Sequence, residues 1–183
     1  MMQFPKAKVL NEIDLNTLVT FILDEEYKCY FLAEAGKEHH RLLSFMSKNI
    51  SGDIVEIGAY KGTSALALSF NDMNQVYSFD IKHITALSGI RNNIKFITDN
   101  DCINNYKSIV LGAKLVFLDV NHDGLYENKV YQFLIDNNYK GLLLLDDIYL
   151  NKAMKAFWNS IKKEKKDLTD IGHWSGTGLV IFE

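Results

Sequence analysis

The sequence has few cysteines, a single proline and no long apolar run. Its two cysteines, Cys29 and Cys102, are too few for a disulfide-rich scaffold, and their spacing does not match a zinc site. The only proline, Pro5, and the lack of a Gly/Ser-rich linker leave no domain boundary beyond the N-terminus. No apolar run approaches the ~20 residues that a membrane helix needs, and the first residues lack the apolar core of a secretory signal. We therefore expect a cytoplasmic protein without membrane contacts.

Neither sign of charge is in large excess. The chain has 23 acidic and 20 basic residues, which gives a formal net charge of −3. A nucleic-acid-binding protein normally carries a basic face, so this balance argues against nucleic acid as a partner. The 183 residues suit one domain, and a hydrophobic content of 48% is ordinary for a globular protein.

Short apolar runs alternate with helical patterns along most of the chain. Five runs predict strands, at residues 53–58, 76–79, 94–97, 115–118 and 142–145. Their continuous apolarity is typical of parallel strands that are covered on both faces. Helical periodicity lies between them, and residues 168–171 and 179–182 predict an antiparallel hairpin. The pattern predicts an α/β fold with a doubly wound, mostly parallel seven-stranded sheet, a C-terminal β-hairpin and N-terminal helices.

The loop after the first strand, EIGAYKGTS at residues 56–64, combines glycines with a carboxylate. In the dinucleotide fingerprint G-x-G-x-x-G, a glycine stands where this chain has Glu56. A carboxylate there suits a ligand with positive charge, such as S-adenosylmethionine, which carries an ammonium and a sulfonium. The carboxylate of that ligand could use the helix start and the hydroxyls of Thr63 or Ser64. The alternative is a plain tight turn with an exposed glutamate.

Further polar residues follow the second and third strands. Asp80 ends the second strand, 22 positions after Gly58, where an acidic residue commonly accepts hydrogen bonds from a ribose diol. Asp99 and Asn100 follow the third strand and could receive an adenine amino group. Helix capping is the alternative role for each of these residues.

The segment EIGAYKGTSAL, residues 56–66, resembles motif I of class I S-adenosylmethionine-dependent methyltransferases, and is closest to O-methyltransferases of the catechol and caffeoyl-CoA type. The resemblance implies a Rossmann-like domain at residues 51–183 that binds S-adenosylmethionine. It also implies that Tyr60 lies along the methionine portion of this cofactor. The residues expected to bind the cofactor are Glu56, Gly58, Tyr60, Gly62, Thr63, Ser64, Asp80, Asp99 and Asn100.

The N-terminal segment, residues 1–50, is expected to form a helical cap over that domain. A helix is predicted over residues 31–46. His39 and His40 are adjacent, so they cannot share one helical face, and they have no nearby cysteine or third spaced ligand. We expect both histidines on the surface.

Three aspartates end the fourth and fifth strands, namely Asp119, Asp146 and Asp147. The carboxyl ends of adjacent parallel strands converge, and three carboxylates there repel one another unless they are protonated or share a cation. Oxygen ligands suit Mg²⁺ first, and Mn²⁺ or Ca²⁺ next. Metal-dependent O-methyltransferases of the catechol type carry acids at the matching positions, which supports this prediction. Helix capping by Asp146 or Asp147 is the alternative.

His122 lies three residues after Asp119, where catechol-type enzymes have a lysine base. The resemblance implies that His122 is the base and Asp119 its catalytic neighbour. A similar pattern in macrocin-type O-methyltransferases leaves Asp123 as an alternative acid. Imidazole accepts protons near pH 7, and a hydroxyl bound to a cation loses its proton readily.

These residues predict an S-adenosylmethionine-dependent methyltransferase that methylates a hydroxyl of a small molecule with the help of a divalent cation. The alternatives are a methyltransferase without metal and a non-catalytic S-adenosylmethionine-binding protein. A nicotinamide oxidoreductase is disfavoured by Glu56. A homodimer is an open alternative to a monomer, because dimers are the commonest assembly.

Overall fold

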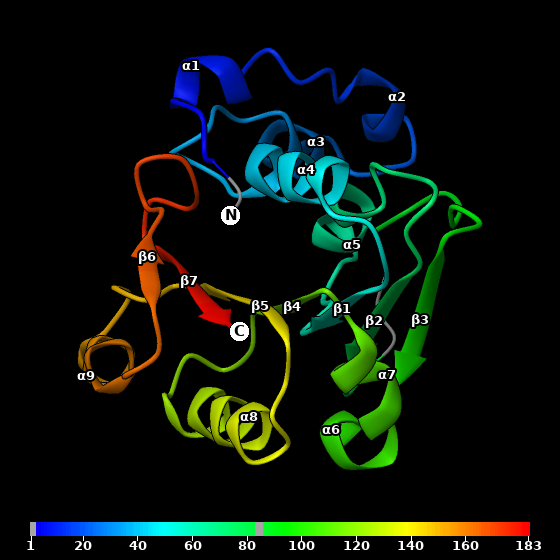
Figure 1. Ribbon diagram of the computed structural model, residues 1–183. Helices are drawn as coiled ribbons and strands as arrows, with labels where there is room; N and C mark the ends of the chain where they lie inside the picture. The colour runs from blue at the N-terminus through cyan, green and yellow to red at the C-terminus, as the bar shows by residue number, and fades with distance from the viewer. Residues whose placement is uncertain (1–2, 83–85) are drawn as a thin grey trace.

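The computed structural model describes residues 3–82 and 86–183 (Figure 1). Its central sheet has seven strands in the order β3-β2-β1-β4-β5-β7-β6. The strands are β1 (Ile54–Ile57), β2 (Val76–Asp80), β3 (Ile94–Thr98), β4 (Leu115–Leu118), β5 (Gly141–Asp146), β6 (Lys165–Asp167) and β7 (Thr177–Phe182). The pairs among β1 to β5 are parallel, and β7 runs antiparallel to both β5 and β6. The predicted doubly wound sheet with a C-terminal antiparallel hairpin is confirmed.

Helices cover both faces of the sheet (Figure 1). One core contains residues of α1 (Ala7–Leu10), α2 (Asn16–Val19), α3 (Glu25–Phe31), α4 (His40–Asn49) and α5 (Thr63–Leu68). The other contains residues of α6 (Cys102–Asn105), α7 (Lys107–Gly112), α8 (Leu125–Asp136) and α9 (Lys152–Ser160). Because both faces are covered, β1 and β4 are buried at every residue, which explains their continuous apolarity. Within the described residues, no helix has the length and apolarity needed to cross a membrane.

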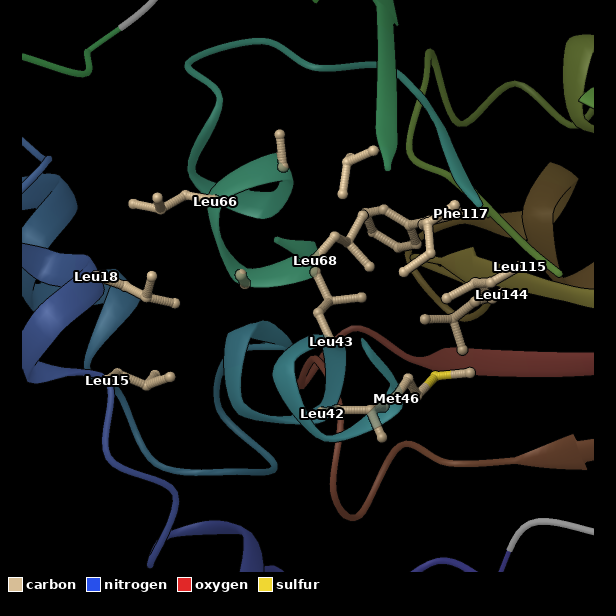
Figure 2. Close-up of a cluster of buried hydrophobic side chains, with 14 of the residues drawn as sticks. Leu15, Leu18, Leu42, Leu43, Met46, Leu66, Leu68, Leu115, Phe117 and Leu144 are labelled. Atoms are coloured by element: carbon tan, nitrogen blue, oxygen red, sulfur yellow. The ribbon is translucent and has the colours of Figure 1, made fainter. Parts of the chain in front are cut away.

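The N-terminal segment shares its core with the sheet. Leu18 of α2 and Leu43 of α4 belong to the same buried cluster as Phe117 of β4 and Leu144 of β5. Figure 2 shows these side chains gathered between the N-terminal helices, α5 and the strands. The predicted helical cap is therefore joined to the sheet by a continuous apolar core.

Two predicted elements differ from the structure. The helix predicted over residues 31–46 is two helices, because α3 ends at Phe31 and α4 begins at His40. Gly36 lies between them at φ +88°, and its N–H donates to the carbonyl of Gly172 at 3.0 Å. The first hairpin strand, predicted at residues 168–171, is instead β6 at Lys165–Asp167. Residues 168–171 are part of the turn that leads to β7, where Ile171 N–H donates to Leu168 O.

Candidate active site

A cavity of about 530 Å³ lies where β1, β2, β3 and β4 end at their carboxyl edge. Ligands in doubly wound sheets bind at this edge, near the point where the strand order reverses. Here that point lies between β1 and β4. The cavity is lined by six predicted site residues, namely Gly58, Tyr60, Asp80, Asp99, Asn100 and Asp119. Its volume suits a ligand the size of a nucleoside derivative.

The loop after β1 is fixed by short backbone contacts. The N–H groups of Gly58 and Ala59 both donate to the carbonyl of Phe79, at 2.8 and 3.1 Å. Gly58 has a φ of +100°, and a Cβ at this position would lie 1.6 Å from the carbonyl oxygen of Asp119. The loop therefore passes so close to the end of β4 that only glycine fits. Gly58 and Asp119 consequently lie side by side in the cavity lining.

Asp80 holds the same loop from β2. Its Oδ2 accepts a hydrogen bond from Tyr60 N–H at 2.7 Å, and its Oδ1 accepts one from Lys82 N–H at 3.0 Å. Each carboxylate oxygen has a second lone pair, so both can still accept a hydroxyl proton. Asp80 is thus placed to fix the loop and to meet a diol at the cavity wall.

Asp99 and Asn100 line the cavity from the end of β3. Asp99 Oδ1 accepts a hydrogen bond from the N–H of Asp101 at 2.7 Å, and Oδ2 accepts one from the side chain of Asn105 at 3.0 Å. The carboxylate therefore has a fixed orientation, while Asn100 is exposed to the cavity and the solvent. Neither bond caps the N-terminus of α6, so the predicted contact of this pair with adenine stays a prediction.

Glu56 does not line the cavity and is fully buried beneath the loop. It stands opposite Ser78 in the parallel register of β1 and β2, and the Ser78 hydroxyl donates to Glu56 Oε2. Burial raises the pKa of Glu56 to about 7, although hydrogen bonds from Ser64 and Ser78 work against this shift. The alternative of an exposed glutamate is therefore wrong, and the predicted contact of Glu56 with the cofactor stays a prediction.

Thr63 and Ser64 also lie outside the cavity lining, as does Gly62. Ser64 is buried and its hydroxyl serves Glu56. Thr63 Oγ1 lies 3.4 Å from His40 Nε2. These three residues join the loop to α5 and to the N-terminal segment, and their predicted contact with the cofactor stays a prediction.

The raised pKa of Glu56 predicts a pH-dependent loss of stability. Its ordinary value is 4.5, so between that pH and about 7 the folded protein keeps a proton that the unfolded chain has lost. The free energy of unfolding therefore falls as the pH rises through this window, by up to about 3 kcal/mol. Glu56→Gln has no carboxyl group to titrate. We therefore expect the free energy of unfolding of the variant minus that of wild type to be about 3 kcal/mol larger at pH 8 than at pH 5.

Urea unfolding of both proteins at the two pH values measures this difference. The same replacement at the exposed Glu164 controls for the chemistry of the substitution. A difference between Glu56→Gln and wild type that is the same at both pH values would contradict the prediction.

The three predicted aspartates lie in a cluster with three histidines, which we call the His/Asp cluster. It comprises His39, Asp119, His122, Asp146, Asp147 and His173. His122 Nε2 lies 3.3 Å from Asp119 Oδ1 and 3.1 Å from Asp147 Oδ2. Burial, and then the Asp146 carboxylate, hold the pKa of Asp119 well above its ordinary value. Asp119 also lines the cavity, so the cluster and the cavity are contiguous.

Backbone strain is concentrated at this site. Four described residues other than glycine have a positive φ, namely Tyr60, His122, Asn138 and Asp147. Three of them are residues that the sequence singles out for function. Such conformations cost of order 1–3 kcal/mol each and are common at functional sites.

Two side chains hold His122 in its left-handed conformation. Its N–H donates to Oε1 of the buried Glu127 at 2.9 Å, and its carbonyl accepts from Asn151 Nδ2 at 2.8 Å. Asp123, the alternative acid, instead accepts hydrogen bonds from the N–H groups of Leu125 and Tyr126 at the start of α8. The side chain of His122 therefore lies in the cluster, whereas Asp123 caps the start of α8.

His39 and His173 were not predicted as site residues. His39 and His40 are both buried, so the expectation that they lie on the surface is wrong. The break at Gly36 sets the start of α4 so that His39 lies 3.4 Å from Asp146 Oδ2. His173 reaches Asp146 because β7 pairs antiparallel with β5, which places the turn before β7 at the carboxyl end of β5. In the sequence, His173 lies in the turn before the last predicted strand. If that strand pairs antiparallel with β5, the residues before it lie next to Asp146.

Comparisons with known proteins identify the fold. No family model matches the chain, and no curated protein matches its sequence. Solved structures do match. A protein of Corynebacterium glutamicum has a TM-score of 0.57 at 14% identity, with 96% of this chain and 94% of the other covered. A Staphylococcus aureus protein, provisionally described as a caffeoyl-CoA O-methyltransferase, has a TM-score of 0.57 at 14% identity, with 99% and 94% covered.

A third solved structure has the same fold. It is an S-adenosyl-L-methionine methyl transferase from Silicibacter pomeroyi, with a TM-score of 0.51 at 12% identity, covering 78% of this chain and 88% of the other. Together with the sheet order, these matches define a Rossmann-like methyltransferase fold.

Proposed function

We propose that this protein is an S-adenosylmethionine-dependent methyltransferase that methylates a hydroxyl group of a small molecule. The observation that carries the proposal is the position of Asp119, which lines the cofactor-sized cavity and also lies 3.3 Å from His122. A methyl donor in the cavity and a proton acceptor in the His/Asp cluster would therefore be neighbours. The fold shared with the Silicibacter pomeroyi methyl transferase supports the same class.

The cavity offers a distinct group to each part of the cofactor. Asp80 would accept hydrogen bonds from the ribose diol, and Asp99 and Asn100 would meet the adenine. Gly58 and Tyr60 would lie along the methionine portion. Glu56 would act indirectly, by supporting the loop from beneath.

His122 is the proposed base. Nε2 of His122 lies within hydrogen-bond distance of Asp119 and Asp147, and Asp119 also lines the cavity. Nδ1 of His122 is buried and has no hydrogen-bond partner within the described residues, so the ring meets the cavity through Asp119. The two carboxylates fix the ring and offset the positive charge that it gains.

In the reaction, an oxygen of the acceptor forms a bond to the methyl carbon as the bond from that carbon to sulfur breaks. The hydroxyl proton passes to the pair formed by Asp119, which lines the cavity, and His122, and S-adenosylhomocysteine leaves. The protein's main contribution is to hold the oxygen and the methyl group in line at close distance.

The residues of the His/Asp cluster fit a divalent cation. Asp146 Oδ1 is buried and accepts no hydrogen bond from any described residue. Burial and the neighbouring carboxylates raise the pKa of Asp119, and a cation would relieve the repulsion between these carboxylates. The predicted ligands are Asp119, Asp146 and Asp147, and the predicted ion is Mg²⁺. When bound, such an ion would ease deprotonation of the acceptor hydroxyl.

Titration of the protein with S-adenosylhomocysteine tests the cofactor site. We expect Asp80→Asn to weaken binding by about 10–100-fold, because hydrogen bonds to a charged group contribute about 1.5–3 kcal/mol. Calorimetry gives the dissociation constants. Asp72→Asn, an exposed acid before the same strand, is the matched control and should bind as wild type does. Equal affinities for both variants would contradict the placement of the ribose.

Formation of S-adenosylhomocysteine with hydroxylated acceptors, with and without EDTA, tests the reaction. Transfer that persists after EDTA treatment would favour a methyltransferase without metal. Tight cofactor binding with no transfer to any acceptor would favour a non-catalytic S-adenosylmethionine-binding protein.

A further inference from the structure

We propose that His39, Asp146 and His173 form a binding site for a divalent transition-metal ion. One ligand atom from each of the three side chains lies within 4.8 Å of the other two. The residues come from three separate elements, namely the start of α4, the end of β5 and the turn before β7. This metal site goes beyond the proposed function, because it differs in donor set and in ion from the all-oxygen magnesium site that the sequence predicts.

The spacing of the donor atoms suits a single ion. His173 Nδ1 lies 3.2 Å from Asp146 Oδ2, and His39 Nδ1 lies 3.4 Å from the same oxygen. Two atoms that each bind one ion at about 2.1 Å lie roughly 3.0–3.4 Å apart in octahedral or tetrahedral geometry. Both distances to Asp146 therefore fit two ligands of one ion.

Two of the donor groups have unpartnered buried atoms. His39 Nδ1 and Asp146 Oδ1 are inaccessible to solvent and make no hydrogen bond with any described residue. His39 is 7% exposed and Asp146 is 3% exposed. Leaving a buried polar atom without a partner is costly, and a cation between these side chains would give His39 Nδ1 a partner.

The surroundings of His173 resemble those of a metal-binding histidine. Glu38 Oε2 lies 3.8 Å from Nε2, on the opposite side of the ring from Asp146. A carboxylate behind a histidine ligand is a common partner that orients the ring. Nδ1 also lies 3.2 Å from Asp147 Oδ1 and 2.9 Å from Ser175 Oγ. A proton on Nδ1 would serve these contacts without an ion, so an ion-free network of imidazolium and carboxylate groups is the competing arrangement.

The mixed donor set indicates which ions bind. Mg²⁺ and Ca²⁺ prefer oxygen ligands, whereas imidazole nitrogen suits Zn²⁺, Fe²⁺, Co²⁺ and Ni²⁺. Two nitrogens and one carboxylate leave further coordination positions open, as in catalytic rather than structural sites. The donor set of His39, Asp146 and His173 thus favours a first-row transition metal over Mg²⁺.

Metal titration of the untagged, chelator-stripped full chain tests the site. We expect one Co²⁺ per chain, with a visible absorption band, and a Co²⁺ affinity at least about 100-fold above that for Mg²⁺. Zn²⁺ should compete with Co²⁺ and remove the band. Mg²⁺ binding as tight as Co²⁺ binding would overturn the proposal in favour of an oxygen-only site. The absence of any bound ion would overturn it in favour of the ion-free network.

Variants locate the ion among the histidines. His39→Gln and His173→Gln should each weaken Co²⁺ binding at least about 10–100-fold. His40→Gln is the matched control: His40 is also buried, but its Nε2 faces Thr63, so Co²⁺ affinity should be kept. Circular dichroism checks the fold of each variant, and His173, in a turn, gives a second test if His39→Gln does not fold.

Unchanged Co²⁺ affinity in folded His39→Gln and His173→Gln would overturn the proposal, as would loss of Co²⁺ binding in His122→Asn alone. S-adenosylhomocysteine is titrated in parallel. Failure of metal binding with intact S-adenosylhomocysteine binding rejects the metal site alone, whereas failure of S-adenosylhomocysteine binding rejects the proposed function.

Discussion

Gly58→Ala is expected to weaken cofactor binding strongly and to destabilise the fold. The added Cβ would lie 1.6 Å from the carbonyl oxygen of Asp119, and the backbone at φ +100° disfavours any side chain. This clash can be relieved only if the ends of β1 and β4 move apart, because the carbonyl of Asp119 is main chain and cannot rotate away as a side chain could. We expect a loss of about 2–4 kcal/mol in the free energy of unfolding and at least about 100-fold in affinity for S-adenosylhomocysteine.

Gly112→Ala is the matched control, since a Cβ at Gly112 would meet no atom within 4 Å. Gly112 ends α7, and alanine there should change stability by less than about 1 kcal/mol, in the favourable direction. Urea unfolding and calorimetry with S-adenosylhomocysteine give both quantities. If Gly58→Ala retained wild-type affinity, the loop would not form the floor of the cofactor site.

His122→Asn is expected to lower kcat by about 10²–10⁴-fold while leaving S-adenosylhomocysteine affinity unchanged. Asparagine tolerates the left-handed backbone of this position, with its φ of +56°, so the loop should keep its conformation. The variant removes the imidazole between Asp119 and Asp147, and with it the proposed proton acceptor. Steady-state rates with any active acceptor, together with calorimetry, separate the two effects.

Asp123→Ser provides the comparison for this loop. Serine can replace aspartate in its hydrogen bonds to Leu125 and Tyr126 N–H, so the start of α8 should be preserved and kcat should stay near that of wild type. The opposite result, with a large loss of kcat in Asp123→Ser and little loss in His122→Asn, would make Asp123 the functional residue.

The sheet could be predicted because its central strands are short, continuously apolar and covered on both faces. Glycine, aspartate and asparagine follow these strands and predict a ligand site at the carboxyl edge of the sheet. The structure brings Gly58, Asp80, Asp99 and Asp119 to a single cavity at that edge. The direction of Glu56 was harder to predict. It is set by its register opposite Ser78, which depends on how β1 pairs with β2.

The histidines of the site depend on tertiary packing that local patterns do not reveal. Helical periodicity runs across residues 31–46, and only the contact of Gly36 with Gly172 shows that the helix breaks and that His39 turns inward. His173 meets Asp146 because the hairpin pairs with β5, a contact between residues far apart in the sequence. Both histidines were therefore missed, although the aspartates they contact were identified.

The position of β7 in the sheet has a consequence for the order of assembly. β7 lies between β5 and β6, although β6 precedes it in the chain. During synthesis β6 has no neighbour to join until β7 emerges and inserts, and long-range pairings of this kind form slowly. Because the turn before β7 carries His173, a nascent chain that ends before residue 177 lacks the strand that places this histidine beside Asp146. Metal uptake should thus be a late event that reports completed folding of this chain.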